Sequence, residues 1–198
     1  MARLHLIRHA ATSDTGIRLT GRLPGVGLDP TGRSQAQALA DLLAGTPLEA
    51  IYSSPLRRCR ETARAIGSAR DLDPIPYHSL IEVDYGTWSG RTFKSLRRAA
   101  AAGGFSTAPS RFAFPGGEAV AAVQGRAVAA CETLAAVHGD APIALVTHGD
   151  IIRTVLAHYL GTPLDLFRRL LIDPASISIV DLSPGSPPVV SAVNRVVP

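Results

Sequence analysis

Three segments of the sequence each join an apolar run to residues that can bind or attack a phosphate group. Arg8 and His9 directly follow an apolar run near the N-terminus, and His148 and Gly149 follow a second run further along the chain. Arg58 stands just after a third run, behind a Ser-Ser-Pro sequence. A neutral imidazole can attack phosphorus, and the arginine fork matches the geometry of phosphate oxygens. These residue types at these places indicate a site for a phosphoryl group.

Short apolar strands alternate with amphipathic helices around these segments. Strands are predicted over residues 3–8, 49–53, 143–147, 176–182 and 188–194. This alternation is typical of an α/β fold with a largely parallel sheet. Because open α/β sheets bind ligands at the carboxyl ends of their strands, the three segments are expected to converge on one phosphate.

Two helix starts are predicted at Asp29 and Ser54, each of which precedes a proline. The second start places Arg58 in the first turn of a helix, where free N–H groups already favour an anion. Apolar residues at helical spacing predict further helices over 120–134 and 151–160.

Residues 84–116 fit the alternation poorly. Of the ten Phe, Trp and Tyr residues in the chain, six lie in this stretch among Gly, Ser and Arg. Long loops in compact domains are often functional, so the stretch could form a lid or a substrate-selecting insertion over the site. The alternative is a surface excursion with its own satellite cluster of hydrophobic residues.

Length and composition limit the class of protein. The 198 residues fit one domain with a full core, predicted to span 1–198, and 46% hydrophobic residues are typical of a folded globule. A net charge of +4 without a basic run between aromatics favours a small phosphorylated metabolite over nucleic acid. A homodimer is possible.

The chain is expected to be cytoplasmic. Its longest apolar stretches are broken well short of a membrane span, which argues against a membrane partner. No signal-peptide pattern precedes the first predicted strand. The two cysteines, Cys59 and Cys131, have no partner motif, so they are expected to be reduced core residues rather than a disulfide or zinc site.

Taken in order along the chain, the motifs resemble those of the histidine phosphatase superfamily, also called the phosphoglycerate mutase-like family. Residues 6–10 match the motif that gives the family its name, and the resemblance covers nearly the whole chain. The other matching segments are residues 28–32 with 35–36, 53–63, 82–90, 115–118 and 146–149. Within the family the chain is similar to small bacterial phosphatases of the α-ribazole phosphatase-like or phosphoglycerate mutase-like type. The resemblance implies a three-layer α/β/α sandwich with a mostly parallel central sheet and the site above the sheet.

The family motifs also imply catalytic roles. The resemblance makes His9 the nucleophile that carries a phosphohistidine, and Glu82 the proton donor to the leaving group. Arg8 and Arg58 are expected to clamp the phosphoryl group, while His148 donates a further hydrogen bond to it. Without the resemblance, a surface carboxylate that caps the following turn would be the preferred interpretation of Glu82.

Four further residues are expected to contact the substrate. Thr12 and Gly149 are candidate phosphate-binding residues, although Thr12 could equally form a local turn. Gly21 and Tyr85 are candidate contacts to the rest of the substrate. No metal site and no cofactor are expected.

The sequence departs from the family pattern at three positions. Ala11 and Thr15 stand where the family often has Glu and Asn, and Asp150 stands where many relatives have a second glycine. A carboxylate facing the phosphate would oppose binding, so Asp150 is interpreted as the N-cap of the following helix, turned away from the ligand. Arg153 is expected to face solvent or the strand ends.

The expected function is hydrolysis of a small phosphate monoester through a phosphohistidine on His9. Three alternatives stay open at this point. The first is a phosphoglycerate mutase, which returns the phosphoryl group to bound product instead of water. The second is a non-catalytic module that binds phosphoesters. The third is a metal site built from His9, Glu82 and His148, which the two neighbouring arginines would disfavour.

Overall fold

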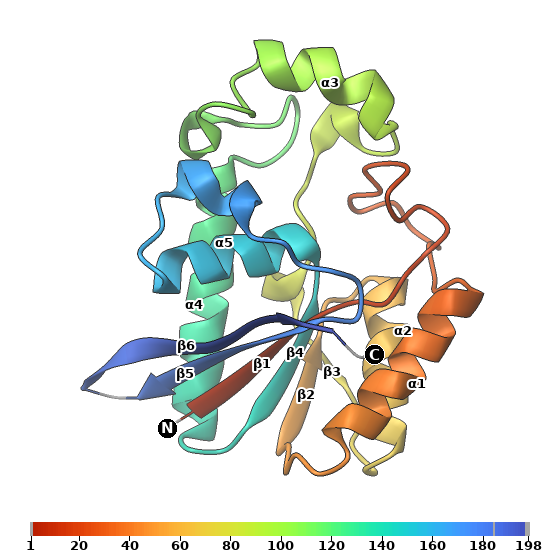
Figure 1. Ribbon diagram of the computed structural model, residues 1–198, viewed down its shortest axis with the longest axis vertical. Coiled ribbons are helices and arrows are strands. Elements are labelled where there is room, and N and C mark those ends of the chain that lie inside the picture. The colour runs from red at the N-terminus through yellow and green to blue at the C-terminus, as the bar shows by residue number, and fades with distance from the viewer. Residues whose placement is uncertain (1, 184, 197–198) are drawn as a thin grey trace.

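A mixed sheet lies between two layers of helices in the computed structural model, which describes residues 2–183 and 185–196 (Figure 1). The strands of the described residues are β1 (Ala2–Arg8), β2 (Ala50–Ser53), β3 (Ile75–Pro76), β4 (Ile143–Thr147), β5 (Ile177–Ser183) and β6 (Ser186–Arg195). They are ordered β3-β2-β4-β1-β5-β6 across the sheet. The first four in this order are parallel, whereas β5 runs antiparallel to both β1 and β6.

The predicted three-layer α/β/α sandwich is confirmed, and the sheet is mostly parallel as expected. All five predicted strands are present to within two residues at either end. The short edge strand β3 was missed, because two residues are too few to show a period. The proline-rich residues 183–188 predict a turn between the last two strands, and this turn lies partly outside the described residues, at residue 184.

Five α-helices surround the sheet in the described part of the chain. They are α1 (Pro30–Leu43), α2 (Arg57–Ser68), α3 (Phe93–Ala102), α4 (Val120–His138) and α5 (Gly149–Tyr159). α1 and α2 cover one face of the sheet, α4 and α5 cover the other, and α3 lies beyond the carboxyl ends of the parallel strands (Figure 1).

The two faces follow from the alternation of side chains along the strands. Leu4 and Leu6 of β1 belong to the buried cluster that contains α4 and α5, whereas Ile7 belongs to the cluster with α1 and α2. In β4 the neighbours Leu145 and Val146 divide in the same way. Because successive side chains of a strand point to opposite faces, a strand buried on both sides needs apolar residues on both faces. β4 is apolar from Ile143 to Val146, and β1 supplies Leu4 and Leu6 to one face and Ile7 to the other.

The two predicted helix starts had different outcomes. The Asp29 carboxylate accepts a hydrogen bond of 2.7 Å from the backbone N–H of Gly32, so this residue caps α1 as predicted. The prediction for Ser54 was wrong, because α2 begins at Arg57 after an N-cap residue, Leu56, that has no side-chain cap. The Ser54 hydroxyl instead lies 2.8 Å from the imidazole of His148.

Most of the aromatic residues of 84–116 belong to the main core or pack against it. Trp88, Phe105, Phe112 and Phe114 pack against one another with ring centroids 5.0 to 6.0 Å apart. They belong to the same hydrophobic cluster as α4 and α5, with Phe105 packed at its edge. They are therefore not a satellite cluster, which was one of the two interpretations of this stretch.

α4 is long and apolar enough to cross a membrane, judged by length and composition alone. α4 contains no long unbroken apolar run, because its many alanines are interrupted by polar residues. Its buried residues, among them Val123, Ala127 and Leu134, pack in the cluster that contains α5 and one face of the sheet. This is the packing of a core helix.

Candidate active site

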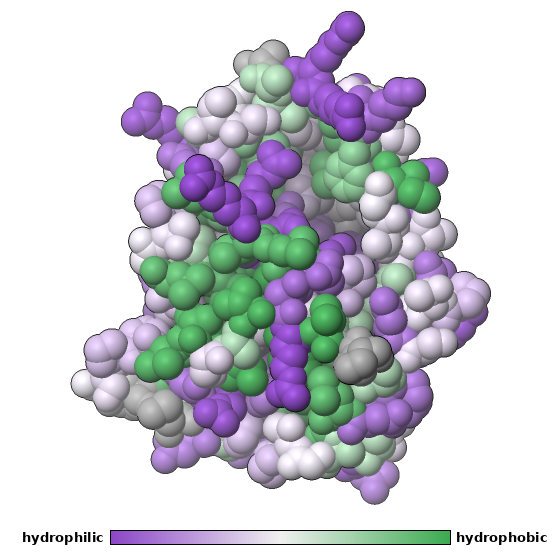
Figure 2. All heavy atoms as spheres, viewed as in Figure 1, coloured by the Kyte–Doolittle hydropathy of each residue, from purple (hydrophilic) through white to green (hydrophobic). Residues whose placement is uncertain are grey.

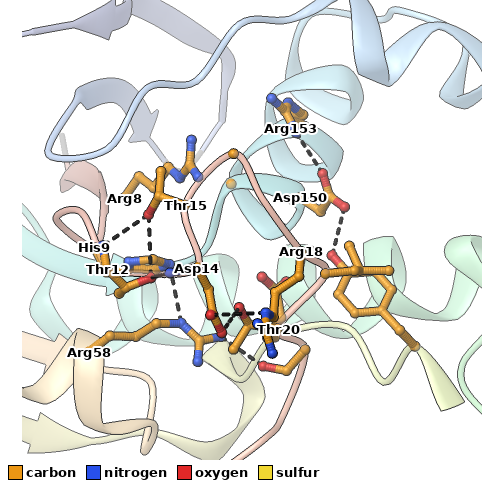
Figure 3. Close-up of a pocket in the computed structure, with 16 residues that line it drawn as sticks. Arg8, His9, Thr12, Asp14, Thr15, Arg18, Thr20, Arg58, Asp150 and Arg153 are labelled. Carbon is orange, nitrogen blue, oxygen red and sulfur yellow. Dashed lines mark hydrogen bonds and ion pairs between the residues drawn. The ribbon is translucent and has the colours of Figure 1, made fainter. Parts of the chain in front are cut away.

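A polar pocket of about 100 Å³ opens at the carboxyl ends of β1 and β4. The three segments singled out in the sequence meet here: Arg8 and His9 come from the end of β1, Arg58 from the first turn of α2, and Gly149 from the start of α5. Figure 3 shows His9 and Arg58 on one side of the pocket, with Asp150 and Arg153 on the other. The predicted convergence of the strand ends is confirmed.

His9 presents one unprotonated ring nitrogen at the floor of this pocket. Its Nδ1 atom lies 2.8 Å from the carbonyl oxygen of Ala10, which can only accept, so Nδ1 carries the proton. Its Nε2 atom accepts a hydrogen bond of 3.2 Å from Nε of Arg58. Burial and the charges of Arg58 and Arg8 hold the pKa of His9 well below the ordinary value. The imidazole is therefore neutral, and the Nε2 lone pair that could attack phosphorus accepts from Arg58 in this structure.

The Arg58 guanidinium joins the groups at the floor of the pocket. Besides His9, it donates from Nη2 to the carbonyl oxygen of Gly21 at 2.8 Å and to Nδ1 of His148 at 3.2 Å. The side chain is buried, and its Nη1 atom has no partner among the described residues. A buried donor without a partner is costly, so Nη1 is suited to receive an anion.

His148 is neutral in this arrangement. Its Nδ1 atom accepts from Arg58, so its proton is on Nε2, which donates to the Ser54 hydroxyl at 2.8 Å. Burial, Arg58 and His9 hold the pKa of His148 well below its usual range. The ring nitrogen that faces the site therefore accepts rather than donates, and it becomes a donor only when the imidazole is protonated.

Glu82 is buried beside these groups, at 9% exposure, and so is not a surface carboxylate. Burial, and next the charge of Asp150, raise the pKa of Glu82 to about 7, against the opposing effects of Arg58 and Arg8. One carboxyl oxygen does accept a hydrogen bond from the N–H of Val83, at 2.9 Å. A carboxyl with this pKa can release and regain a proton near neutral pH.

Arg8 and Gly149 form the opposite wall. Arg8 donates from Nη1 to the carbonyl oxygen of Ile172 at 2.6 Å, while its buried Nε atom has no partner among the described residues. A Cβ atom at Gly149 would lie 3.3 Å from this Nε, so a larger residue would crowd the guanidinium. Glycine here lets Arg8 lie against the start of α5, where first-turn N–H groups are free.

The remaining predicted residues also line the pocket, with roles that differ in detail. The Thr12 hydroxyl accepts a hydrogen bond of 3.3 Å from the N–H of Asp14, so it forms a local turn as well as facing the site. Gly21, at φ +58, holds Arg58 through its carbonyl oxygen. The Tyr85 hydroxyl donates to the Asp150 carboxylate at 2.8 Å.

The interpretation of Asp150 was wrong, whereas Arg153 faces the strand ends, one of the two positions predicted for it. Asp150 is not the N-cap of α5, which is His148, and its carboxylate lines the pocket instead of turning away. Arg153 lines the pocket as well and donates to Asp150 from Nη1 at 2.7 Å. The repulsion argument failed because it treated the carboxylate as unpaired. Their spacing of three residues in a helix was the signal that could have predicted this pair.

Sequence reasoning missed the loop that closes the pocket on the outer side. Asp14 and Arg18 of this loop form an ion pair at 3.2 Å and line the site. The loop is bound to the start of the 84–116 stretch, since the N–H of Leu19 donates to the Arg91 carbonyl oxygen at 2.9 Å. Within the described residues, no group of three or more His, Cys, Asp or Glu side chains is arranged to hold a metal ion.

Comparison with known proteins decides the family. A family model described as histidine phosphatase superfamily (branch 1) matches residues 4–195. The chain belongs to this superfamily. The candidate site of this histidine phosphatase lies where the segments that carry Arg8, His9, Arg58 and Gly149 come together.

Several similar proteins are named as phosphatases. The chain is 32% identical to phosphoserine phosphatase 1 of Hydrogenobacter thermophilus, over 92% of this chain and 87% of that protein. It is 36% identical to glucosyl-3-phosphoglycerate phosphatase of Mycolicibacterium vanbaalenii, over 82% of this chain and 76% of that protein. The solved structure of Bacillus stearothermophilus YhfR matches with a TM-score of 0.91 at 28% identity, covering 99% of this chain and 98% of that one. This histidine phosphatase is an enzyme that hydrolyses phosphate esters, so the mutase and the non-catalytic module are set aside.

Proposed function

We propose that the enzyme hydrolyses a small phosphate monoester by way of a phosphohistidine on His9. The observation that carries this proposal is the state of the His9 ring, whose Nε2 atom is unprotonated and lies 3.2 Å from a buried guanidinium. An imidazole nitrogen held in this way is a competent nucleophile toward phosphorus.

In the first step, Nε2 of His9 forms a bond to phosphorus while the bond from phosphorus to the leaving oxygen breaks. Glu82 gives its proton to that oxygen, so the product leaves as an alcohol rather than an alkoxide. In the second step water attacks phosphorus, and the Glu82 carboxylate takes a proton from this water. The bond from phosphorus to Nε2 breaks, which returns neutral His9 and releases inorganic phosphate.

The charge of the transferring phosphoryl group is balanced by donors that lack partners. Nη1 of Arg58 and Nε of Arg8 are buried without hydrogen bonds among the described residues, and we assign both to phosphate oxygens. We assign the Thr12 hydroxyl and the Gly149 N–H to the same group. A bound dianion favours the protonated form of His148, whose Nδ1 atom then donates to phosphate.

The substrate is proposed to be a small phosphorylated metabolite, and residues 84–116 to select it, with Tyr85 at the boundary of the site. Gly21 acts through Arg58 rather than by touching the substrate. A cytoplasmic location is also proposed, and it is supported by two cysteines that are buried and unpaired.

A phosphate-release screen tests the proposal. Purified protein is given alkyl, aryl and sugar phosphates and phosphoamino acids, with and without EDTA, beside a His9→Asn variant whose folding is checked by thermal unfolding. We expect release that EDTA leaves unchanged, and a loss of at least ~10³-fold in the variant, the scale seen when a nucleophile is removed. Wild-type rates in a folded His9→Asn variant would contradict the covalent mechanism.

A further inference from the structure

A second pocket of about 370 Å³ adjoins the phosphate pocket. The two pockets share Leu19, Tyr85, Asp150 and Arg153 as lining residues. The phosphate pocket, at about 100 Å³, is the smaller of the two, and Arg8, His9 and Arg58 line it but not the second pocket. A leaving group attached to a phosphoryl group at His9 can therefore extend into the second pocket.

One side of the second pocket is apolar and largely aromatic. Trp88, Phe105 and Phe114 come from the aromatic core of the 84–116 stretch, and Leu96 comes from α3. Phe93 also lines the pocket and is 45% exposed, which is unusual for so large an apolar side chain. Such walls favour a ligand with an apolar or flat body.

The other side of the second pocket carries positive charge. Arg97 of α3 and Arg168, of the 3-10 turn η4 (Leu164–Arg169), line it, and neither is paired with a carboxylate among the described residues. The Arg168 guanidinium lies over the Phe105 ring, 4.8 Å from its centroid. Figure 2 shows hydrophilic side chains around a recess below α3.

The one carboxylate that lines this pocket is already neutralised. Asp150 accepts from Nη1 of Arg153 at 2.7 Å and from the Tyr85 hydroxyl at 2.8 Å. The charge left for a ligand is that of Arg97 and Arg168. Two guanidinium groups at the edge of an apolar pocket are suited to a carboxylate or a second phosphate.

We propose that the second pocket binds the leaving group of the substrate, and that this group has an apolar or aromatic body with a second anionic group at its far end. The inference rests on the proposed function, because it takes the phosphoryl group to lie at His9. Arg97 and Arg168 are then specificity-determining residues that take no part in the chemistry.

The neighbouring arginines supply a matched control. Arg98 and Arg169 are each one residue away on the same elements, are exposed, and do not line the pocket. The double variants Arg97→Ala/Arg168→Ala and Arg98→Ala/Arg169→Ala therefore lose the same net charge, so a general effect of charge on anion binding cancels between them.

Binding is measured with two phosphonates that cannot be hydrolysed, 4-carboxybenzylphosphonate and benzylphosphonate, by calorimetry on the full chain. We expect the wild type and the Arg98/Arg169 variant to bind the carboxylated compound at least ~10-fold more tightly, about 1.4 kcal/mol. The Arg97/Arg168 variant should bind both compounds with nearly equal affinity. No preference in the wild type, or equal loss of preference in both variants, would overturn the proposal.

Turnover of 4-carboxyphenyl phosphate and phenyl phosphate by the same variants distinguishes this proposal from the proposed function. We expect the ratio of the two kcat/KM values to follow the ratio of phosphonate affinities across the variants. Phosphonate selectivity without any phosphate release would contradict the proposed function and leave the second pocket established. Phosphate release without selectivity would support the proposed function and contradict the proposed role of the second pocket.

Discussion

Nδ1 of His148 lies 3.6 Å from a carboxyl oxygen of Glu82, which is close enough for the charge of each group to depend on the other. Burial and Asp150 raise the pKa of Glu82 to about 7, whereas burial and Arg58 lower the pKa of His148 well below its usual value. Near neutral pH the proton of this pair therefore resides on Glu82. This is the state that a proton donor to a leaving group requires.

The pH dependence of the phosphorylation step follows from this pair. A raised pKa means that Glu82 is protonated below about pH 7 and loses its proton above it, so kcat/KM for an alkyl phosphate should fall as the pH rises through this value. The lowered pKa of His9 keeps the nucleophile neutral through the weakly acidic range. In a Glu82→Gln variant the falling limb should disappear. A limb that persists in this variant would belong to another group.

A comparison of two leaving groups tests, independently of pH, whether Glu82 is the proton donor. Glu82→Ala should lower kcat/KM for an alkyl phosphate on the order of 10²-fold or more, the scale of general acid catalysis. For a dinitrophenyl phosphate, kcat/KM should fall much less, because its leaving group needs no proton. The readout is kcat/KM, since a slow dephosphorylation common to both esters would mask the difference in kcat. Equal losses would mean that Glu82 only orders the site.

The charge of Asp150 should influence the pH at which kcat/KM falls. Its negative charge is the second cause, after burial, of the raised pKa of Glu82. Asp150→Asn keeps an oxygen that can accept from Tyr85 but removes the charge. We expect the falling limb of kcat/KM to shift to lower pH, as measured on the same alkyl phosphate. An unshifted limb would show that burial alone controls the Glu82 proton.

Arg58→Lys should lower kcat/KM more than a substitution that conserves charge normally does. The Arg58 guanidinium bonds to His9 from Nε and to Gly21 and His148 from Nη2, and its Nη1 atom is left for phosphate. The single nitrogen of an ammonium group cannot reach all of these partners at once. We expect a loss of at least ~10-fold in kcat/KM, about 1.4 kcal/mol of transition-state stabilisation.

Arg57→Lys is the control for this substitution. Arg57 is exposed and pairs with Glu61 at 2.6 Å on the outer side of α2. Its replacement should leave kcat/KM nearly unchanged. Similar losses in the two variants would mean that the helix start, rather than the bonds made by Arg58, is what the substitutions disturb.

The strands and the convergence of the site could be predicted from the sequence because both depend on local pattern. The apolar run before His148 ends at Thr147, where β4 ends. Contacts between distant segments could not be predicted in this way. The carbonyl oxygen of Gly21 accepts from Arg58, which lies 37 positions later in the sequence. The Ser54 hydroxyl does not cap α2 but bonds to His148, 94 positions later.

Asp150 shows a different limit of sequence reasoning. An isolated carboxylate opposes the binding of phosphate. Asp150 is not isolated, because it pairs with Arg153, one helical turn away, and accepts from Tyr85, which lies 65 positions earlier in the chain. Partners change the outcome, because Arg153 offsets the charge of Asp150 toward a phosphate, although this charge still raises the pKa of the neighbouring Glu82.

Detection of phosphate on His9 is the most direct test of the mechanism. A dinitrophenyl phosphate is mixed with the wild type and with a His148→Ala variant, in which dephosphorylation is expected to slow, and the reaction is quenched after milliseconds. The account predicts an acid-labile, base-stable phosphate on His9, which is absent in His9→Asn. Release of inorganic phosphate at undiminished rates, without label on His9 in either enzyme, would contradict it.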